Sequence, residues 1–125
     1  MRKEERITEE AGKYIDAARH FDGIGRAIRS IQVSSIQQML STNDTVQREA
    51  IQATTSEAIQ RAIAEGQALL SPPVKALSEL IEPSDEAVYF RHQNQQARVR
   101  PRKEATPPQN RFEVEVEDNG SWVAV

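Results

Sequence analysis

The chain contains no cysteine among its 125 residues. This absence excludes disulfide bonds, thiolate nucleophiles and every metal site that depends on cysteine. Only 5% of the residues are aromatic and 38% are hydrophobic, so we expect a thin core built mainly from Ala, Ile and Val. A thin core is typical of a chain whose burial is completed by another subunit.

Strong net charge and long apolar runs are also missing. The formal net charge of −3 is too small to indicate nucleic acid or a membrane surface as a partner on bulk grounds. No apolar run approaches the roughly 20 residues that a helix needs to cross a bilayer, so we expect no membrane span. The charged opening MRKEERITEE has no apolar segment behind it, which favours a cytoplasmic protein over one secreted by a signal peptide.

Recognisable catalytic sets are absent as well. No serine lies in a Gly-x-Ser-x-Gly elbow, and Gly23-Ile24-Gly25 lacks the preceding strand and third glycine of a dinucleotide loop. Asp16 and His20 are four residues apart on one helix face, but no further ligands follow at the spacing of a metal site. We therefore predict a protein that is not an enzyme, with no catalytic residue, cofactor or metal.

Residues 1–83 are predicted to be a helical region. Apolar residues recur at three- and four-residue spacing over residues 1–21, and Asp22-Gly23 is expected to end this first helix. A second helix is expected over residues 24–40. Its apolar residues cover more than one stripe, which predicts that this helix makes contacts on two faces.

The remainder of the helical region is predicted as two more helices. Ser41-Thr42-Asn43-Asp44 is a cluster of turn and capping residues, and a third helix is expected from Thr45 to Leu70. Ser71-Pro72-Pro73 fits the start of a short final helix, because proline suits the first helical position.

Residues 84–110 are predicted as a short helix or strand followed by an extended tether. We favour helix through Gln96, with strand kept as the alternative for residues 87–96. Beyond Arg91 apolar residues are few and prolines interrupt any helix. Five cations of this segment could contact phosphate groups or an acidic protein partner, or could belong to a plain linker, and the acidic net charge favours the last two: Arg91, Arg98, Arg100, Arg102 and Lys103.

Residues 111–125 are predicted to form a C-terminal β-hairpin. Asn119-Gly120 fits a type I′ turn, because both of its central residues need positive φ. This turn pairs Val116 with Val123, which gives the hairpin one apolar face and one acidic face. An isolated hairpin is marginal in water, so we expect it to dock as an arm on a neighbouring subunit, with packing on its own chain as the alternative. The expected docking residues are Phe112, Val114, Val116, Trp122, Val123 and Val125.

Together these features predict a mainly α protein: an elongated bundle of three to four helices, a basic proline-containing tether and a C-terminal hairpin. The predicted function is that of a structural subunit of a homo-oligomer or larger hetero-assembly. In composition the chain looks like minor virion proteins of tailed bacteriophages, such as head–tail, tail or internal components, which adds the virion to the expected locations. The alternatives are a nucleic-acid-associated regulator acting through the arginine segment and a small inhibitor or adaptor that binds one host protein.

Overall fold

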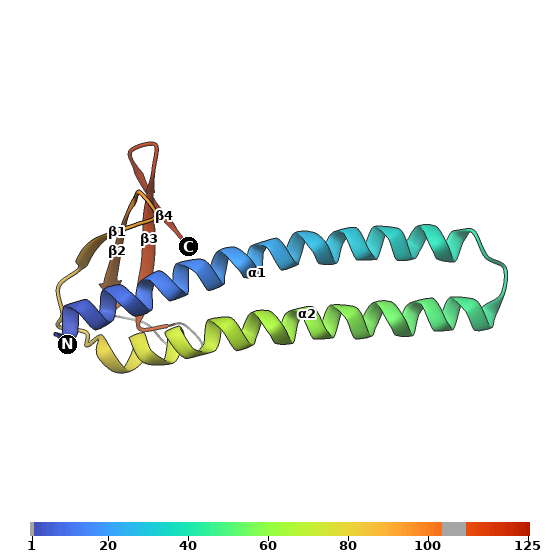
Figure 1. The fold of residues 1–125 in the computed structure, drawn as a ribbon, viewed down its shortest axis with the longest axis horizontal. Helices are drawn as coiled ribbons and strands as arrows, with labels where there is room; N and C mark the ends of the chain where they lie inside the picture. The colour runs from blue at the N-terminus through green and yellow to red at the C-terminus, as the bar shows by residue number, and fades with distance from the viewer. Residues whose placement is uncertain (1, 104–109) are drawn as a thin grey trace. The chain divides into compact units, whose positions relative to one another are not determined.

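The computed structural model describes residues 2–103 and 110–125 and contains two long helices followed by a four-stranded antiparallel sheet (Figure 1). The helices are α1 (Lys3–Leu40) and α2 (Thr45–Leu80). The strands are β1 (Val88–His92), β2 (Gln95–Pro101), β3 (Phe112–Asp118) and β4 (Ser121–Ala124). The strands pair in the order β1-β2-β3-β4, so the expectation of a mainly α bundle of three to four helices is wrong.

The chain divides into two compact units. The first, which we call the sheet unit, comprises Met1–Arg19 and Leu69–Val125 and so contains the sheet with one end of each helix. The second, the helical unit, is His20–Ala68 and contains the interhelical turn. Each unit therefore draws on both helices.

Both expected breaks inside the helices are wrong. Helix α1 continues through Asp22-Gly23, and α2 continues through Pro72 and Pro73 to Leu80. A glycine inside a helix costs only about 1 kcal/mol relative to alanine, which tertiary packing can offset. An interior proline costs about 3 kcal/mol or more, but Pro73 is itself buried and the same part of α2 carries the fully buried Leu77. Burial of this turn of α2 in the core thus overrides the local preference.

The predicted tether is also wrong over its described part, because residues 88–101 form the hairpin of β1 and β2. Strand, which was the alternative for residues 87–96, is the observed structure. The two central turn residues, Gln93 and Asn94, have φ of 50° and 63°. These values match a type I′ turn built without glycine, which leaves no conspicuous hairpin signal in the sequence. The part of the tether at residues 104–109 lies outside the described residues.

The hairpin of β3 and β4 has the register that the Asn-Gly signal predicts. Val116 pairs with Val123 and Asp118 pairs with Ser121. Asn119 and Gly120 both have positive φ, 52° and 83°, as the type I′ turn requires. The register predicted for this hairpin from the sequence is therefore confirmed, although the hairpin belongs to a larger sheet.

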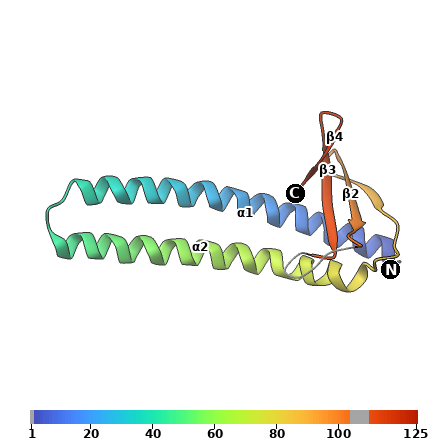
Figure 2. The ribbon, with the colours of Figure 1, turned by 180° about the vertical axis from the view of Figure 1, so that it is seen from behind.

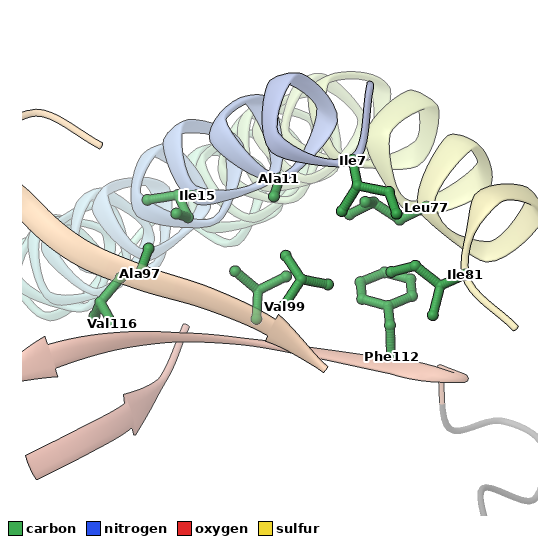
Figure 3. Close-up of a cluster of buried hydrophobic side chains, with 10 residues drawn as sticks. Ile7, Ala11, Ile15, Leu77, Ile81, Ala97, Val99, Phe112 and Val116 are labelled. Atoms are coloured by element: carbon green, nitrogen blue, oxygen red, sulfur yellow. The ribbon is translucent and has the colours of Figure 1, made fainter. Parts of the chain in front are cut away.

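The core of the sheet unit lies between one face of the sheet and the ends of the two helices (Figure 3). Ile15, Leu77 and Val99 are its largest fully buried side chains, and they come from α1, α2 and β2. Tyr14 and Phe112 meet edge to face, with ring centroids 5.8 Å apart. The remaining buried members of the cluster are Ile7, Ala11, Ile81, Ala97, Val114 and Val116. One core thus joins residues from both ends of the described chain.

The helical unit consists of two helices that lie side by side (Figure 2). Ser35 on α1 and Thr55 on α2 are joined by a hydrogen bond in which the Thr55 hydroxyl donates to Ser35 Oγ over 2.9 Å. Gly66 lies under the ring of Phe21, where an added Cβ would stand 2.4 Å from Cδ2. All residues of this unit are described, and only Ser35 and Gly66 among them are buried. The unit therefore has a contact seam without a closed apolar core.

Neither helix contains an apolar window of the length and hydropathy that crossing a bilayer requires, within the described residues. This finding agrees with the expectation of no membrane span.

Candidate partner interface

The face of the sheet that points away from the core carries a ladder of opposite charges. Arg98 Nε lies 2.9 Å and Arg100 Nε 2.8 Å from the same oxygen of Glu115. Arg100 and Arg102 each also reach the carboxylate of Glu113, at 3.1 and 3.3 Å. The Glu115 side chain is only 7% exposed and its hydrogen bond raises the pKa of Arg98. These ion pairs join β2 to β3 across neighbouring registers.

An aromatic pair covers Arg98 on the same face. The Arg98 guanidinium lies 4.4 Å from the centroid of the Trp122 ring, in cation–π contact. Tyr89 meets Trp122 edge to face with centroids 6.0 Å apart. These contacts link the two edge strands β1 and β4 over the central strands, so the outer face of the sheet is held together by its own side chains.

The predicted phosphate-contacting cations are therefore mostly engaged within the chain. Arg98, Arg100 and Arg102 bind the glutamates of β3, whereas Arg91 on β1 and Lys103 after β2 are exposed. The sequence contained both halves of this arrangement, since the arginines alternate in RVR and the glutamates alternate in EVEVE. If the two segments are paired as neighbouring strands, the sequence predicts these ion pairs.

The predicted docking residues of the hairpin separate into two groups. Phe112, Val114 and Val116 are buried in the chain's own core, and Val125 packs against that core. The docking face expected for these residues is thus already covered within the chain. Trp122 lies on the opposite face beside Arg98, and Val123 is 45% exposed.

A polar cluster that sequence reasoning missed attaches the β1–β2 turn to α1. His92 Nε2 lies 2.8 Å from Asp16 Oδ1, and the Gln93 amide donates to the same oxygen over 3.4 Å. Arg19 also donates to Gln95. The His92 ring rests on Gly12, where an added Cβ would stand 3.2 Å from Nδ1. Asp16, which the sequence pairs with His20, here positions the turn.

A small cavity of about 150 Å³ in the sheet unit is lined by the start of α1, the segment after α2 and residues of β1 and β2. Lys3 Nζ and Asp85 Oδ2 form an ion pair of 2.8 Å at this cavity. The backbone N–H of Glu82 and the Lys3 ammonium lower the pKa of Asp85. An ionised carboxylate that is already bound to a lysine and a backbone N–H makes a poor general base. These contacts therefore support the fold and not catalysis.

Two grooves of the helical unit are lined by both Ser35 and Thr55. One is about 380 Å³ and the other about 560 Å³. The larger is lined by the apolar residues Ile36, Met39 and Ile59 and by glutamine, serine and threonine side chains. Neither groove is lined by a charged side chain. The surface between the helices is thus open, uncharged and partly apolar.

A stripe of exposed apolar residues continues from the larger groove along α1. Val33 and Ile36 are each 55% exposed and Leu40 is 79% exposed. Their spacing of three and four residues places them on one side of the helix, about 130° around its axis from the half-buried stripe that contains Ser35. We call Val33, Ile36 and Leu40 the exposed stripe. The sequence predicts contacts on two faces of this segment, and within the described chain the face that carries the exposed stripe has no such contact.

The region around the exposed stripe is almost free of charge. Residues 30–47 contain one ionisable side chain, Asp44, in a protein that is 28% charged. Asp44 caps α2, because its carboxylate accepts the backbone N–H of Val46 over 2.9 Å. Val46 itself is 73% exposed. Four of the exposed large apolar side chains of the described residues thus lie in roughly the last two turns of α1 or the first turn of α2.

Comparison with protein-family models, with curated proteins and with solved structures found no match.

Proposed function

We propose that the protein is a structural, non-enzymatic subunit that joins a larger assembly through its helical unit. The observation that carries this proposal is the exposed stripe, whose three apolar side chains lie on one side of α1. Soluble monomers expose single apolar residues routinely, whereas a contiguous apolar patch bordered by polar residues is typical of an interaction site.

The energetics of the helical unit support the same interpretation. Its large apolar side chains are at best half-buried, because two helices side by side can cover each other on one stripe only. Full burial of a Val, Leu or Ile side chain contributes about 1.5–3 kcal/mol. Covering the exposed stripe would therefore add several kcal/mol that the isolated unit does not obtain, before the entropy of association is subtracted.

The uncharged surroundings of the exposed stripe add a second argument. The cores of protein interfaces are depleted of charged residues, because a charge that is desolvated without a partner is costly. Residues 30–47 meet this requirement with Asp44 as their one ionisable side chain. Membership of a tailed-bacteriophage virion stays a prediction from composition.

The alternatives rest on the arginine segment or on an unspecified partner. Arg98, Arg100 and Arg102 are engaged by Glu113 and Glu115, and phosphate binding would have to compete with these contacts. The regulator therefore draws less support from the geometry than the assembly subunit does, and the inhibitor or adaptor stays a prediction.

The proposal is tested by the absolute mass of the full chain in solution, measured by light scattering on a size-exclusion column across a range of concentrations. We expect a mass above the 14.1 kDa of the monomer. Substituting Leu40→Gln should shift the mass toward the monomer, because it places a polar amide on the exposed stripe while keeping a good helix former.

The matched control is Leu69→Gln, which removes an exposed leucine of the sheet unit, 49% exposed. This variant should leave the mass unchanged. A wild-type chain that stays monomeric at every concentration, or equal effects of the two substitutions, would contradict assembly through the helical unit.

A further inference from the structure

We infer that the free edge of β4 in one copy of the chain pairs with the free edge of β1 in the next copy, so that the sheets join head to tail. This contact belongs to the sheet unit and goes beyond the proposed function, because it does not involve the exposed stripe. Within the described residues β1 and β4 are the outer strands of the sheet, and each has a strand on one side only. Such edges present unpaired backbone N–H and C=O groups, which are a template for a strand of another chain.

The hydrogen bonds of β4 show which of its residues face the free edge. The Val125 N–H donates to the Val114 C=O over 3.0 Å. Along an antiparallel pair, residues that exchange hydrogen bonds alternate with residues that do not. Val123 is therefore bonded to β3, whereas Trp122 and Ala124 direct their backbone groups away from β3. Each of these two residues offers one donor and one acceptor at the free edge.

The free edge of β1 has the same spacing. His92 and Gln95 close a two-residue turn, and the closing pair of such a turn exchanges hydrogen bonds. Phe90, two residues earlier, is therefore also bonded to β2. Tyr89 and Arg91 direct their backbone groups to the free edge, so β1 and β4 each offer two residues that are two positions apart.

One register pairs all of these edge residues. Trp122 of one copy lies opposite Arg91 of the next copy. Ala124 then lies opposite Tyr89, and each pair exchanges two hydrogen bonds. A shift of two residues in either direction moves one pair beyond the ends of the strands. The two strands are antiparallel in this register, which keeps the core-facing sides of both sheets on the same side.

Charge determines that unlike edges meet. Arg91 and Glu117 are exposed, and both stay outside the ion-pair ladder. Glu117 pairs with Trp122, so the register places Arg91 of the next copy two strand spacings, roughly 10 Å, from Glu117. Side chains already span two strands in this sheet, since Arg98 on β2 reaches Trp122 on β4. Pairing of β1 with β1, or of β4 with β4, brings Arg91 to no acid of the outer face.

β4 lacks the features that keep edge strands apart. Monomeric sheets blunt their edges with charged side chains, proline or β-bulges. Ser121–Ala124 contains no charge or proline, and it pairs with β3 in an unbroken register. Val123 is 45% exposed and would lie opposite the half-buried Phe90 of the next copy. A contact between unlike edges repeats from copy to copy, so it builds a ring or an open filament.

Cysteine variants test the register, because the natural chain has no cysteine. Every variant also carries Leu40→Gln, which removes the contribution of the exposed stripe. Residues of a hydrogen-bonded pair have Cα atoms about 5.5 Å apart, which a disulfide can span. Tyr89→Cys and Ala124→Cys should therefore cross-link under mild oxidation when the two variants are mixed, and neither should cross-link alone. A chain with both substitutions should give a series of covalent multimers.

Charge variants supply an independent readout, the association constant from sedimentation equilibrium. Arg91→Glu should weaken association roughly tenfold, because it turns an attraction into a repulsion. Glu117→Arg should have a similar effect, and the chain with both substitutions should regain most of the loss. Lys103→Glu is the matched control, since it makes the same charge change at an exposed position outside both edge strands. Circular dichroism of each variant checks that the fold is retained.

The outcomes separate this inference from the proposed function. A mixture of folded Tyr89→Cys and Ala124→Cys that does not cross-link would overturn the head-to-tail contact, whatever Leu40→Gln does to the mass. Self-cross-linking of Val123→Cys would also overturn it, because that result places β4 against β4. Equal weakening by Arg91→Glu and Lys103→Glu would overturn Arg91 as the residue that selects the edge. Cross-linking of the mixture, with a mass that Leu40→Gln leaves unchanged, would support this contact and contradict assembly through the helical unit.

Discussion

The two units of this molecule contrast in how they use apolar residues. The sheet unit places Ile15, Leu77 and Val99 in full burial, whereas the helical unit buries only Ser35 and Gly66. Both units are built from segments of the same two helices, so a helix pair by itself does not produce a closed core. A sheet that covers the helix ends completes the core of one unit, and the other unit lacks such a layer within the described chain. The contrast shows that an amphipathic helix pair needs a third layer before it can close a core.

The largest expected effect comes from matched leucine substitutions in the two units. Leu77→Ala should lower the free energy of unfolding by about 2–5 kcal/mol, because it leaves a cavity in a closed core. Leu40→Ala, at a position 79% exposed, should change monomer unfolding by less than about 0.5 kcal/mol. Urea denaturation at low protein concentration measures both. Equal losses would show that the helical unit has a closed core after all.

The ion-pair ladder gives the next effect. Glu115→Gln removes the charge that Arg98 and Arg100 share and should cost about 1–3 kcal/mol, because Glu115 is buried beneath them. Glu117→Gln is the control, since Glu117 is exposed on the same strand. Thermal unfolding of the two variants should show a clear decrease for the first only. An unchanged transition for Glu115→Gln would mean that the ladder adds nothing to stability.

Two glycines of the helical unit, one packed against a side chain and one facing open space, should respond oppositely to alanine substitution. Gly66→Ala forces a Cβ to 2.4 Å from the Phe21 ring and should destabilise the chain by about 1–2 kcal/mol, net of the helix propensity that alanine gains. Gly23→Ala meets nothing within 4 Å and should stabilise it by up to about 1 kcal/mol. Denaturant titration tests the opposite signs. Stabilisation by both would show that Phe21 moves aside freely.

The smallest effect concerns pH and the sheet unit alone. The pKa of Asp85 is lowered in the folded chain from an ordinary value of 3.8, first by the backbone N–H of Glu82 and then by Lys3. A carboxyl group with a lowered folded pKa stabilises the fold above its unfolded pKa, and this contribution is lost as the pH falls through the folded value. The melting temperature of wild type should therefore exceed that of Asp85→Asn at pH 6, and the difference should shrink below about pH 4. A constant difference would argue against this linkage.

Local signals determined what the sequence could predict. Asn119-Gly120 and the alternation around it specified the register of β3 and β4, because turn type and side-chain period act between neighbours in the chain. The second stripe of α1 was likewise readable from periodicity alone. The turn at Gln93 and Asn94 was not readable, since neither residue is the glycine that usually supplies a positive φ.

The errors arose where distant contacts override local preference. Gly23 and Pro72 are helix breakers by local propensity, yet α1 and α2 pass through them. RVRPRK resembled a linker because its stabilising partners, Glu113 and Glu115, lie on another strand. The candidate interface was predicted only in part, because distant contacts also decide which helix faces are covered. Periodicity indicated two apolar faces on residues 24–40, but only the structure shows which of them remains exposed.

The order in which the core residues are synthesised follows from their positions in the chain. Ile7, Ala11 and Ile15 precede in the chain, by roughly a hundred residues, the strand residues that cover them, such as Val99 and Val114. A ribosome synthesises both helices completely before it supplies the sheet. The first turns of α1 therefore wait, with their apolar side uncovered, for strands about a hundred residues later, and long-range closure of this kind is intrinsically slow.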